Sequence, residues 1–142
     1  MENFKQTNLD DNILKAVTEM GFEKPTSVQA KTIPHLLNSN TDLIATAQTG
    51  TGKTAAFGLP SIHLTDLKNR DTSTLVLCPT RELCIQIAKD LTKYSKYVDG
   101  LSILAVYGGS DIRGQIKALN KGVHIVIGTP GRTKDLIKRN KL

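Results

Sequence analysis

The sequence predicts an α/β fold in which a parallel sheet is flanked by helices. Four short apolar runs alternate with segments of helical spacing, an order typical of βαβ units with right-handed crossovers. The runs show almost no polar alternation, which favours strands covered on both faces. They occupy residues 43–46, 74–78, 102–106 and 124–127.

Helical patterns precede and separate these runs. Apolar residues with helical spacing predict a helix over 9–20, which Gly21 ends. Thr26 or Ser27 is expected to cap a short second helix, which Pro34 breaks or turns into a following turn. Further helices are predicted over 53–67, 81–97 and 111–120.

The most informative segment is Ala47–Thr54, which joins the first predicted strand to a helix. A glycine-rich turn ending in Gly-Lys-Thr in this setting is typical of a phosphate-binding P-loop. Lys53 can reach the β- and γ-phosphates of a nucleotide, and the Thr54 hydroxyl can ligate Mg²⁺. The sequence departs from the strict pattern at its first position, where Ala47 replaces glycine. The candidate phosphate-binding residues are Gln48, Thr49, Gly50, Thr51, Gly52, Lys53 and Thr54.

Each of the other predicted strands also ends in a turn with residues suited to phosphate. The carboxyl ends of parallel strands meet at one edge of a sheet, where ligands bind in such folds. Arginine forks and glycine amides suit contacts with phosphate oxygens. We therefore expect all four segments at one edge of the molecule; the last three are 79–83, 107–110 and 128–132.

Composition limits the classes of partner. The 142 residues fit one domain, and their net charge of +6 favours a polyanion. Aromatic content is only 4%, so a nucleic acid would be held mainly through phosphate and sugar. No apolar run approaches the ~18 residues of a membrane span, so no membrane partner is expected. Cys78 and Cys84 have neither disulfide nor metal spacing, which favours reduced thiols and a cytoplasmic location.

Taken together, these motifs resemble the first RecA-like domain of DEAD-box ATP-dependent RNA helicases, over essentially the whole chain. Gly21–Gln29 is similar to the Q motif of that family, and Phe4 to its isolated upstream aromatic residue. Residues 47–54 resemble motif I, 79–83 motif Ia, 108–109 the GG motif and 129–132 motif Ib.

The resemblance implies ATP and Mg²⁺ as ligands and single-stranded RNA as partner. Gln29 would read the adenine edge, Phe4 would stack on the base, and Thr26 would tie the Q motif to the P-loop. Lys24 belongs to the same motif. The implied RNA-backbone residues are Pro79, Thr80, Arg81, Gly108, Gly109, Thr129, Pro130, Gly131 and Arg132.

The resemblance also implies an organisation. Residues 1–38 would form a Q-motif helical region, and 39–142 part of a RecA-like P-loop NTPase domain whose central strands are missing, leaving unpaired strand edges. The family's Asp-Glu-Ala-Asp box, Ser-Ala-Thr motif and second RecA-like domain are not in this sequence. We therefore expect an RNA-dependent ATPase that unwinds short duplexes, of which these 142 residues bind without turnover.

Two alternatives remain open. A truncated module could hold ATP or RNA without any catalytic cycle. Another P-loop NTPase, such as a small kinase, would share the phosphate-binding turn. Gln29 and the arginines at the strand ends argue against a kinase, as does the lack of a candidate acceptor-binding lid.

Overall fold

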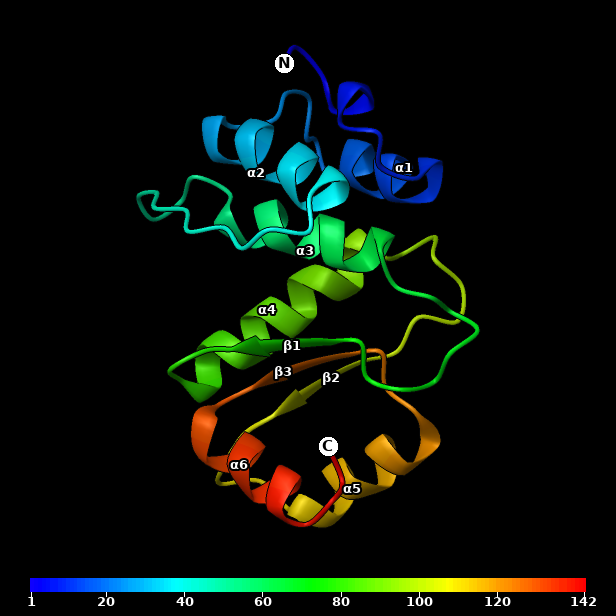
Figure 1. The fold of residues 1–142 in the computed structure, drawn as a ribbon, viewed down its shortest axis with the longest axis vertical. Coiled ribbons are helices and arrows are strands. Elements are labelled where there is room, and N and C mark those ends of the chain that lie inside the picture. Colours follow the sequence, from blue (N-terminus) through cyan, green and yellow to red (C-terminus); the bar gives the residue numbers. More distant parts are fainter. The chain divides into compact units, whose positions relative to one another are not determined.

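The computed structural model describes residues 1–142. The chain forms two compact units (Figure 1). The first comprises Met1–Leu64 and Lys93–Asp99, and the second comprises Thr65–Thr92 and Gly100–Leu142. The sequence-based division at residue 38 stays a prediction.

The first unit is helical. Its elements are the short 3-10 helix η1 (Phe4–Thr7) and the helices α1 (Asp11–Glu19), α2 (Ser27–Asn38) and α3 (Lys53–His63). Fully buried apolar side chains from these helices, among them Ile13, Val17, Ile33 and Leu59, form its core. The predicted helix over 9–20 is confirmed as α1, and the one predicted over 53–67 ends earlier, at His63.

Helix α2 corrects the expectation for Pro34. The helix continues through this proline to Asn38 and does not break there. A proline removes one backbone donor from a helix, a cost that packing can offset. Helix α2 packs against α3, and the Thr32 hydroxyl lies 3.4 Å from the Ala56 carbonyl oxygen.

The predicted strand over 43–46 is absent. Residues 41–47 form no ladder with any other segment, and the Ile44 side chain is 95% exposed. A strand is stable only when a neighbouring strand satisfies its backbone groups. Because no described segment pairs with residues 43–46, their apolar pattern is insufficient to form a strand.

Residues 93–99 are tied to the first unit by aromatic and ionic contacts. The Tyr94 ring packs edge-on against Phe22, with ring centroids 6.1 Å apart. The Glu19 carboxylate accepts hydrogen bonds from the Tyr97 hydroxyl and from Lys96 Nζ. These two bonds hold the pKa of Glu19 below its usual range, the Tyr97 bond contributing most.

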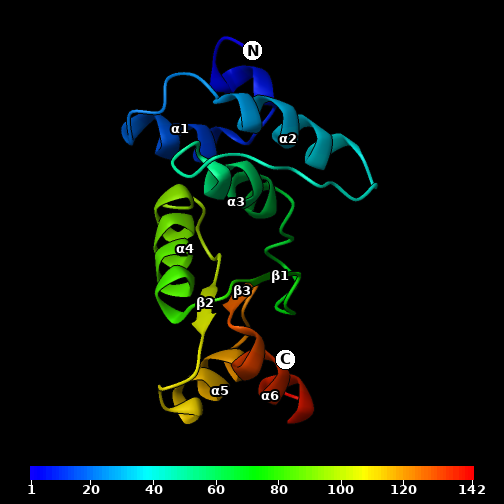
Figure 2. The same cartoon turned by 90° about the vertical axis from the view of Figure 1, so that its left-hand side faces the viewer.

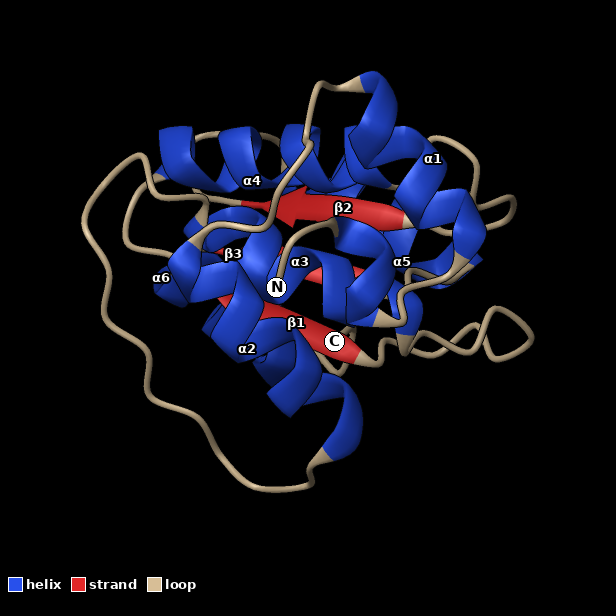
Figure 3. Cartoon of the chain, turned by 90° about the horizontal axis from the view of Figure 1, so that it is seen from above, coloured by secondary structure: helices blue, strands red, loops and turns tan.

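The second unit is built on a three-stranded parallel sheet. Its strands are β1 (Thr74–Leu77), β2 (Ile103–Val106) and β3 (Ile125–Gly128). Their order is β1-β3-β2, with Val76 opposite Ile127 and Ala105 opposite Ile127 on the other side (Figure 3). The predicted strands over 74–78, 102–106 and 124–127 are thus confirmed within a residue or two at each end.

Helices cover both faces of this sheet (Figures 1 and 2). Helix α4 (Arg81–Tyr94) lies on one face, and α5 (Ile112–Lys121) and α6 (Pro130–Lys138) lie on the other. The predicted helices over 81–97 and 111–120 correspond to α4 and α5. Val126 packs with Val106 and Leu136 on the α5–α6 side. Ile125 and Ile127 point to the opposite face because strand residues alternate.

The end of β3 is packed so closely that only glycine fits. A Cβ atom at Gly128 would lie 2.1 Å from the Thr133 hydroxyl oxygen and 2.9 Å from Val106 Cγ2. This close approach brings the first turn of α6 directly against the sheet.

Strand β1 pairs only with β3, which leaves its other edge unpaired, as expected. Leu75 and Leu77 on this strand are 44% and 58% exposed. None of the helices combines the length and the apolarity needed to cross a membrane.

Candidate functional site

The P-loop forms the N-terminal cap of α3 in the first unit. Gly52 is the cap residue, with φ of +82°, and Gly50 has φ of +77°. Both are left-handed conformations that glycine adopts without steric cost. The turn therefore brings the free amides of the α3 N-terminus, with their partial positive charge, to one place. This is the geometry of an anion site.

The loop is held by hydrogen bonds within itself. The Thr51 hydroxyl donates to the Gln48 carbonyl oxygen at 2.6 Å, and Lys53 Nζ donates to the Ala47 carbonyl oxygen at 2.7 Å. The exposed Lys53 ammonium thus lies against the loop at the start of the helix, where a phosphate could take the place of the carbonyl. The residues Gln48 and Thr49 are exposed.

Thr54 is the chain's candidate metal ligand. Its side chain is half-buried in the first turn of α3, and its hydroxyl has no partner within the chain. Mg²⁺ takes few protein ligands and keeps phosphate oxygens and waters as the others. One free hydroxyl beside an anion site fits that need.

Gln29 joins the Q-motif segment to the P-loop. It is 3% exposed and forms a capping box with Thr26. Its Oε1 accepts from the Thr26 backbone N–H at 3.0 Å, and its Nε2 donates to the Gly52 carbonyl oxygen at 3.1 Å. The polar link is thus made by Gln29, whereas the Thr26 hydroxyl accepts from the Gln29 backbone N–H and only the Thr26 methyl group lies beside Gly52. The role of Thr26 in tying the Q motif to the P-loop stays a prediction.

An open hollow lies beside these groups. It has a volume of about 520 Å³ and is lined by residues of α2 and its cap and of the loop over 43–51, including Thr26, Lys31, Gln48 and Thr51. This volume is within the usual range for small-molecule sites.

Two other residues predicted to contact the nucleotide, Phe4 and Lys24, form no hydrogen bond with the P-loop. The Phe4 ring is 4% exposed and packs on Phe22, with centroids 6.0 Å apart. Stacking of Phe4 on a base therefore stays a prediction. Lys24 is exposed in the turn before α2 and takes no part in the hydrogen bonds that cap this helix.

In the second unit, three predicted segments meet at one sheet edge. The strands are parallel, so the turns after β1, β2 and β3 emerge together. Thr80 caps α4 by accepting from the Leu83 N–H at 3.2 Å, and Pro130 occupies the first turn of α6. The expectation of a fourth segment following a strand is wrong, because no strand precedes the P-loop.

The Tyr107 ring supports the Arg81 side chain at this edge, a role that the sequence analysis did not predict. The Arg81 guanidinium lies over the Tyr107 ring, 5.1 Å from its centroid. A Cβ atom at Gly109 would lie 3.3 Å from Arg81 Nη1, so the glycine loop leaves room for this side chain. An aromatic residue directly before a glycine pair was the available signal.

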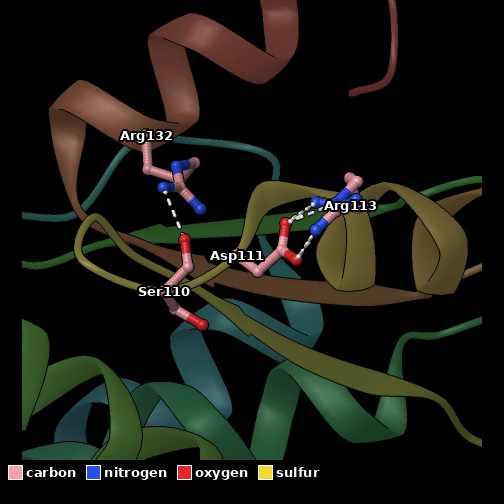
Figure 4. Close-up of polar contacts among 4 residues, drawn as sticks. All are labelled: Ser110, Asp111, Arg113 and Arg132. Carbon is pink, nitrogen blue, oxygen red and sulfur yellow. Dashed lines mark hydrogen bonds and ion pairs between the residues drawn. The ribbon is translucent and has the colours of Figure 1, made fainter.

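Arg132 is held by neutral acceptors. Its Nη2 donates to the Ser110 carbonyl oxygen at 3.0 Å (Figure 4), and its Nη1 donates to Gln115 Oε1 at 2.9 Å. Nearby, Asp111 caps α5 and binds the Arg113 guanidinium (Figure 4). The Arg113 hydrogen bonds hold the pKa of Asp111 below its usual range, and the charge of Arg132 adds to this.

Comparison with protein families gives a consistent match. The model of the DEAD/DEAH box helicase family matches residues 26–142. The chain is 53% identical over 142 residues to the ATP-dependent RNA helicase CshA of Listeria monocytogenes, covering 100% of this chain and 27% of that protein. It is 47% identical to the ATP-dependent RNA helicase DeaD of Klebsiella pneumoniae, covering 98% of this chain and 22% of that protein.

Solved structures agree. A DEAD box protein from the hyperthermophile Methanococcus jannaschii superimposes with a TM-score of 0.92 at 48% identity, over 99% of this chain and 38% of the other. Dbp5 of S. cerevisiae, bound to RNA and ADP BeF3, gives 0.89 at 28% identity, over 100% of this chain and 35% of the other. The chain thus spans about a quarter of the length of the curated relatives that it matches.

The close fit of Gln29 on the P-loop predicts unequal effects for two glycine substitutions. A Cβ at Gly52 would lie 2.2 Å from Gln29 Nε2, whereas one at Gly50 would meet nothing within 4 Å. Gly50→Ala should cost only the left-handed strain, ~1 kcal/mol. Gly52→Ala should cost ~1–3 kcal/mol more in unfolding free energy, because the buried amide must move. Chemical denaturation measures both; equal losses would contradict the fit.

Proposed function

Since the chain belongs to the DEAD/DEAH box helicase family, we propose that it is the part of an ATP-dependent RNA helicase that holds ATP and contacts RNA. The observation that carries this proposal is the bond from the Gln29 amide to the P-loop turn at Gly52. It joins a group able to recognise a base to a group able to hold phosphates. The relatives it resembles are named ATP-dependent RNA helicases.

In this proposal the P-loop binds the triphosphate. Amides at the α3 N-terminus and Lys53 Nζ contact phosphate oxygens, and the carbonyl bond of Lys53 gives way to them. Thr54 would hold Mg²⁺, which neutralises phosphate charge when it is bound. All of these groups come from one turn, so the phosphates are positioned by a single local structure.

Gln29 would select adenine. Its Oε1 accepts one hydrogen bond and its Nε2 donates one within the chain. One lone pair on Oε1 and one hydrogen on Nε2 therefore remain for a base. Adenine offers a matching N6 donor and N7 acceptor, whereas guanine presents an O6 acceptor in place of the donor. The internal bonds fix the rotamer, so the amide is oriented before the base arrives.

The edge at the ends of β1, β2 and β3 would hold the RNA backbone. Arg81 and Arg132 supply charge there, and Gly108 and Gly109 give close approach to backbone amides. The net charge of +6 favours the same partner. The similar Dbp5 structure contains RNA, which supports the assignment.

The remaining machinery would lie outside these 142 residues. Hydrolysis needs a carboxylate that orients water and an arginine that stabilises the transition state. We propose that a second RecA-like domain supplies the arginine in the longer protein. We also propose that the 142 residues bind ATP and RNA without turnover, and that the protein works in the cytoplasm.

Lys53→Ala should weaken ATP binding and leave the fold unchanged, because the side chain is exposed and bonded only to the loop. The expected loss is ~1–3 kcal/mol in binding free energy, the scale of a lost charged hydrogen bond. Calorimetric titration with ATP and Mg²⁺ measures it. Lys68→Ala, which removes an exposed lysine from the loop between α3 and β1, serves as control. Undiminished affinity in a folded Lys53→Ala chain would remove Lys53 from the site.

The nucleotide site should prefer ADP to GDP. Gln29→Ala should reduce ADP affinity by ~1–3 kcal/mol and reduce the preference between the two nucleotides. The measurement is a titration of labelled ADP and GDP, with Gln86→Ala as control because Gln86 is exposed on α4. Equal wild-type affinities for the two nucleotides would sink the adenine-reading role.

RNA binding should be tolerant of sequence and sensitive to salt. Affinities for two unrelated single-stranded RNAs should agree within a few-fold and fall together as salt rises. Arg132→Ala should reduce the salt slope by about one phosphate contact. Arg139→Ala is the control, since Arg139 pairs with Asp135 at the other end of α6. A flat salt response, or strong preference for one RNA, is incompatible with backbone recognition.

A further inference from the structure

We infer that Gln115 is a positioning residue that orients the Arg132 guanidinium toward RNA by tying it to the glycine loop after β2. The inference rests on the proposed RNA-binding function and adds a residue that no motif of the sequence indicated. Gln115 lies on α5, which the sequence presents as an ordinary amphipathic helix.

Both ends of the Gln115 amide are used. The side chain is 7% exposed, its Nε2 donates to the Tyr107 carbonyl oxygen at 3.3 Å, and its Oε1 accepts from Arg132 Nη1 at 2.9 Å. A buried amide is stable only when such partners satisfy it. Gln115 therefore joins the turn after β2 to the first turn of α6 through one rigid group.

A second bond completes the orientation. Arg132 Nη2 donates to the Ser110 carbonyl oxygen at 3.0 Å. Two different nitrogens of the planar guanidinium are thus fixed by two acceptors, which sets the plane as well as the position. Because guanidinium has five N–H donors, the others stay available for a phosphate fork.

Both acceptors of the Arg132 hydrogen bonds, an amide oxygen and a backbone carbonyl oxygen, are neutral. The carboxylate nearest to Arg132 in sequence, Asp135, accepts a hydrogen bond from Arg139 Nε. The carboxylate of Asp111, in the turn that also holds Ser110, is bonded to the Nε and Nη2 atoms of Arg113 and not to Arg132. Arg132 is therefore oriented by an amide and a carbonyl oxygen without being paired to an acid. Neither acceptor is ionised, so the charge of Arg132 is not neutralised by a direct ion pair and can act on a polyanion; Gln115→Glu would place a negative charge against it.

A double-mutant cycle tests whether Gln115 acts through Arg132. Affinity for a fluorescent single-stranded RNA is measured for the 142-residue chain, for Gln115→Met, for Arg132→Ala and for the double variant. Gln115→Met removes both amide bonds at similar volume. It should weaken binding about three- to tenfold, the scale of a disturbed charged contact, but less than twofold when Arg132 is already alanine. Equal losses in both backgrounds, or no loss, would overturn the inference.

Gln86→Met is the matched control. Gln86 makes one exposed bond to Asp90 on α4, so its replacement should leave RNA affinity unchanged. Gln115→Glu keeps an acceptor for Arg132 and adds charge, and it should weaken RNA binding most at low salt. A Gln115→Glu chain that binds RNA as tightly as the wild type contradicts the role of the neutral amide.

A readout without RNA separates this inference from the proposed function. In ¹⁵N-labelled wild-type chain the Arg132 side chain should show slow guanidinium rotation, with resolved Nη signals, because two of its nitrogens are bonded. Gln115→Met should average those signals, and unchanged Arg132 signals would refute positioning by Gln115. If Gln115→Met does not fold, Gln115→Asn replaces it, since the shorter side chain cannot reach both partners. A wild-type chain that binds no RNA would refute the proposed function, and the Arg132 signals would still decide the positioning.

Discussion

The parallel ladder around β3 sets the geometry on which the second unit depends. Because β1 and β2 both pair with β3 in the same direction, their following turns leave the sheet at one edge. Three segments separated by many residues in sequence thereby supply one surface. The absence of a side chain at Gly128 lets α6 start directly against that edge, which brings Arg132 to it.

The first unit uses a different device, since no strand precedes its P-loop. There a single buried amide fixes the loop: Gln29 caps α2 through Oε1 and binds the Gly52 carbonyl oxygen through Nε2. The N-terminal caps of α2 and α3 are thus connected through the Gln29 side chain. Any ligand that moves Gly52 must also act on the start of α2, so the proposed base recognition and the proposed phosphate binding would share one structural element.

Local signals predicted the parts of the structure that local chemistry determines. The start of α3 at Lys53, the cap at Thr26 and the three strands of the sheet follow from turn residues and apolar runs. Residues 43–46 failed as a strand because pairing depends on a neighbour, which an apolar run does not specify. Pro34 was tolerated because packing against α3 outweighs one lost hydrogen bond. The family motifs identified Arg81 and Arg132, but not the residues that orient them.

Tyr107 lies in a segment predicted for the edge, but no role was predicted for its side chain, and Gln115 was not predicted because a glutamine on a helix is an ordinary residue in sequence. Only their contacts distinguish them, and these contacts constrain the two arginines differently. Arg81 is exposed and rests on an aromatic face, which restrains its position but leaves rotation about that face. Arg132 is fixed in plane by two directional bonds. Ordering a side chain on binding costs roughly 0.5–1.5 kcal/mol. Because the two hydrogen bonds already order the Arg132 side chain, a phosphate that binds it would lose little further side-chain entropy. In the proposed RNA complex, Arg132 would accordingly be suited to set the register of the RNA backbone on the edge, whereas Arg81 could follow variations in the path of the RNA.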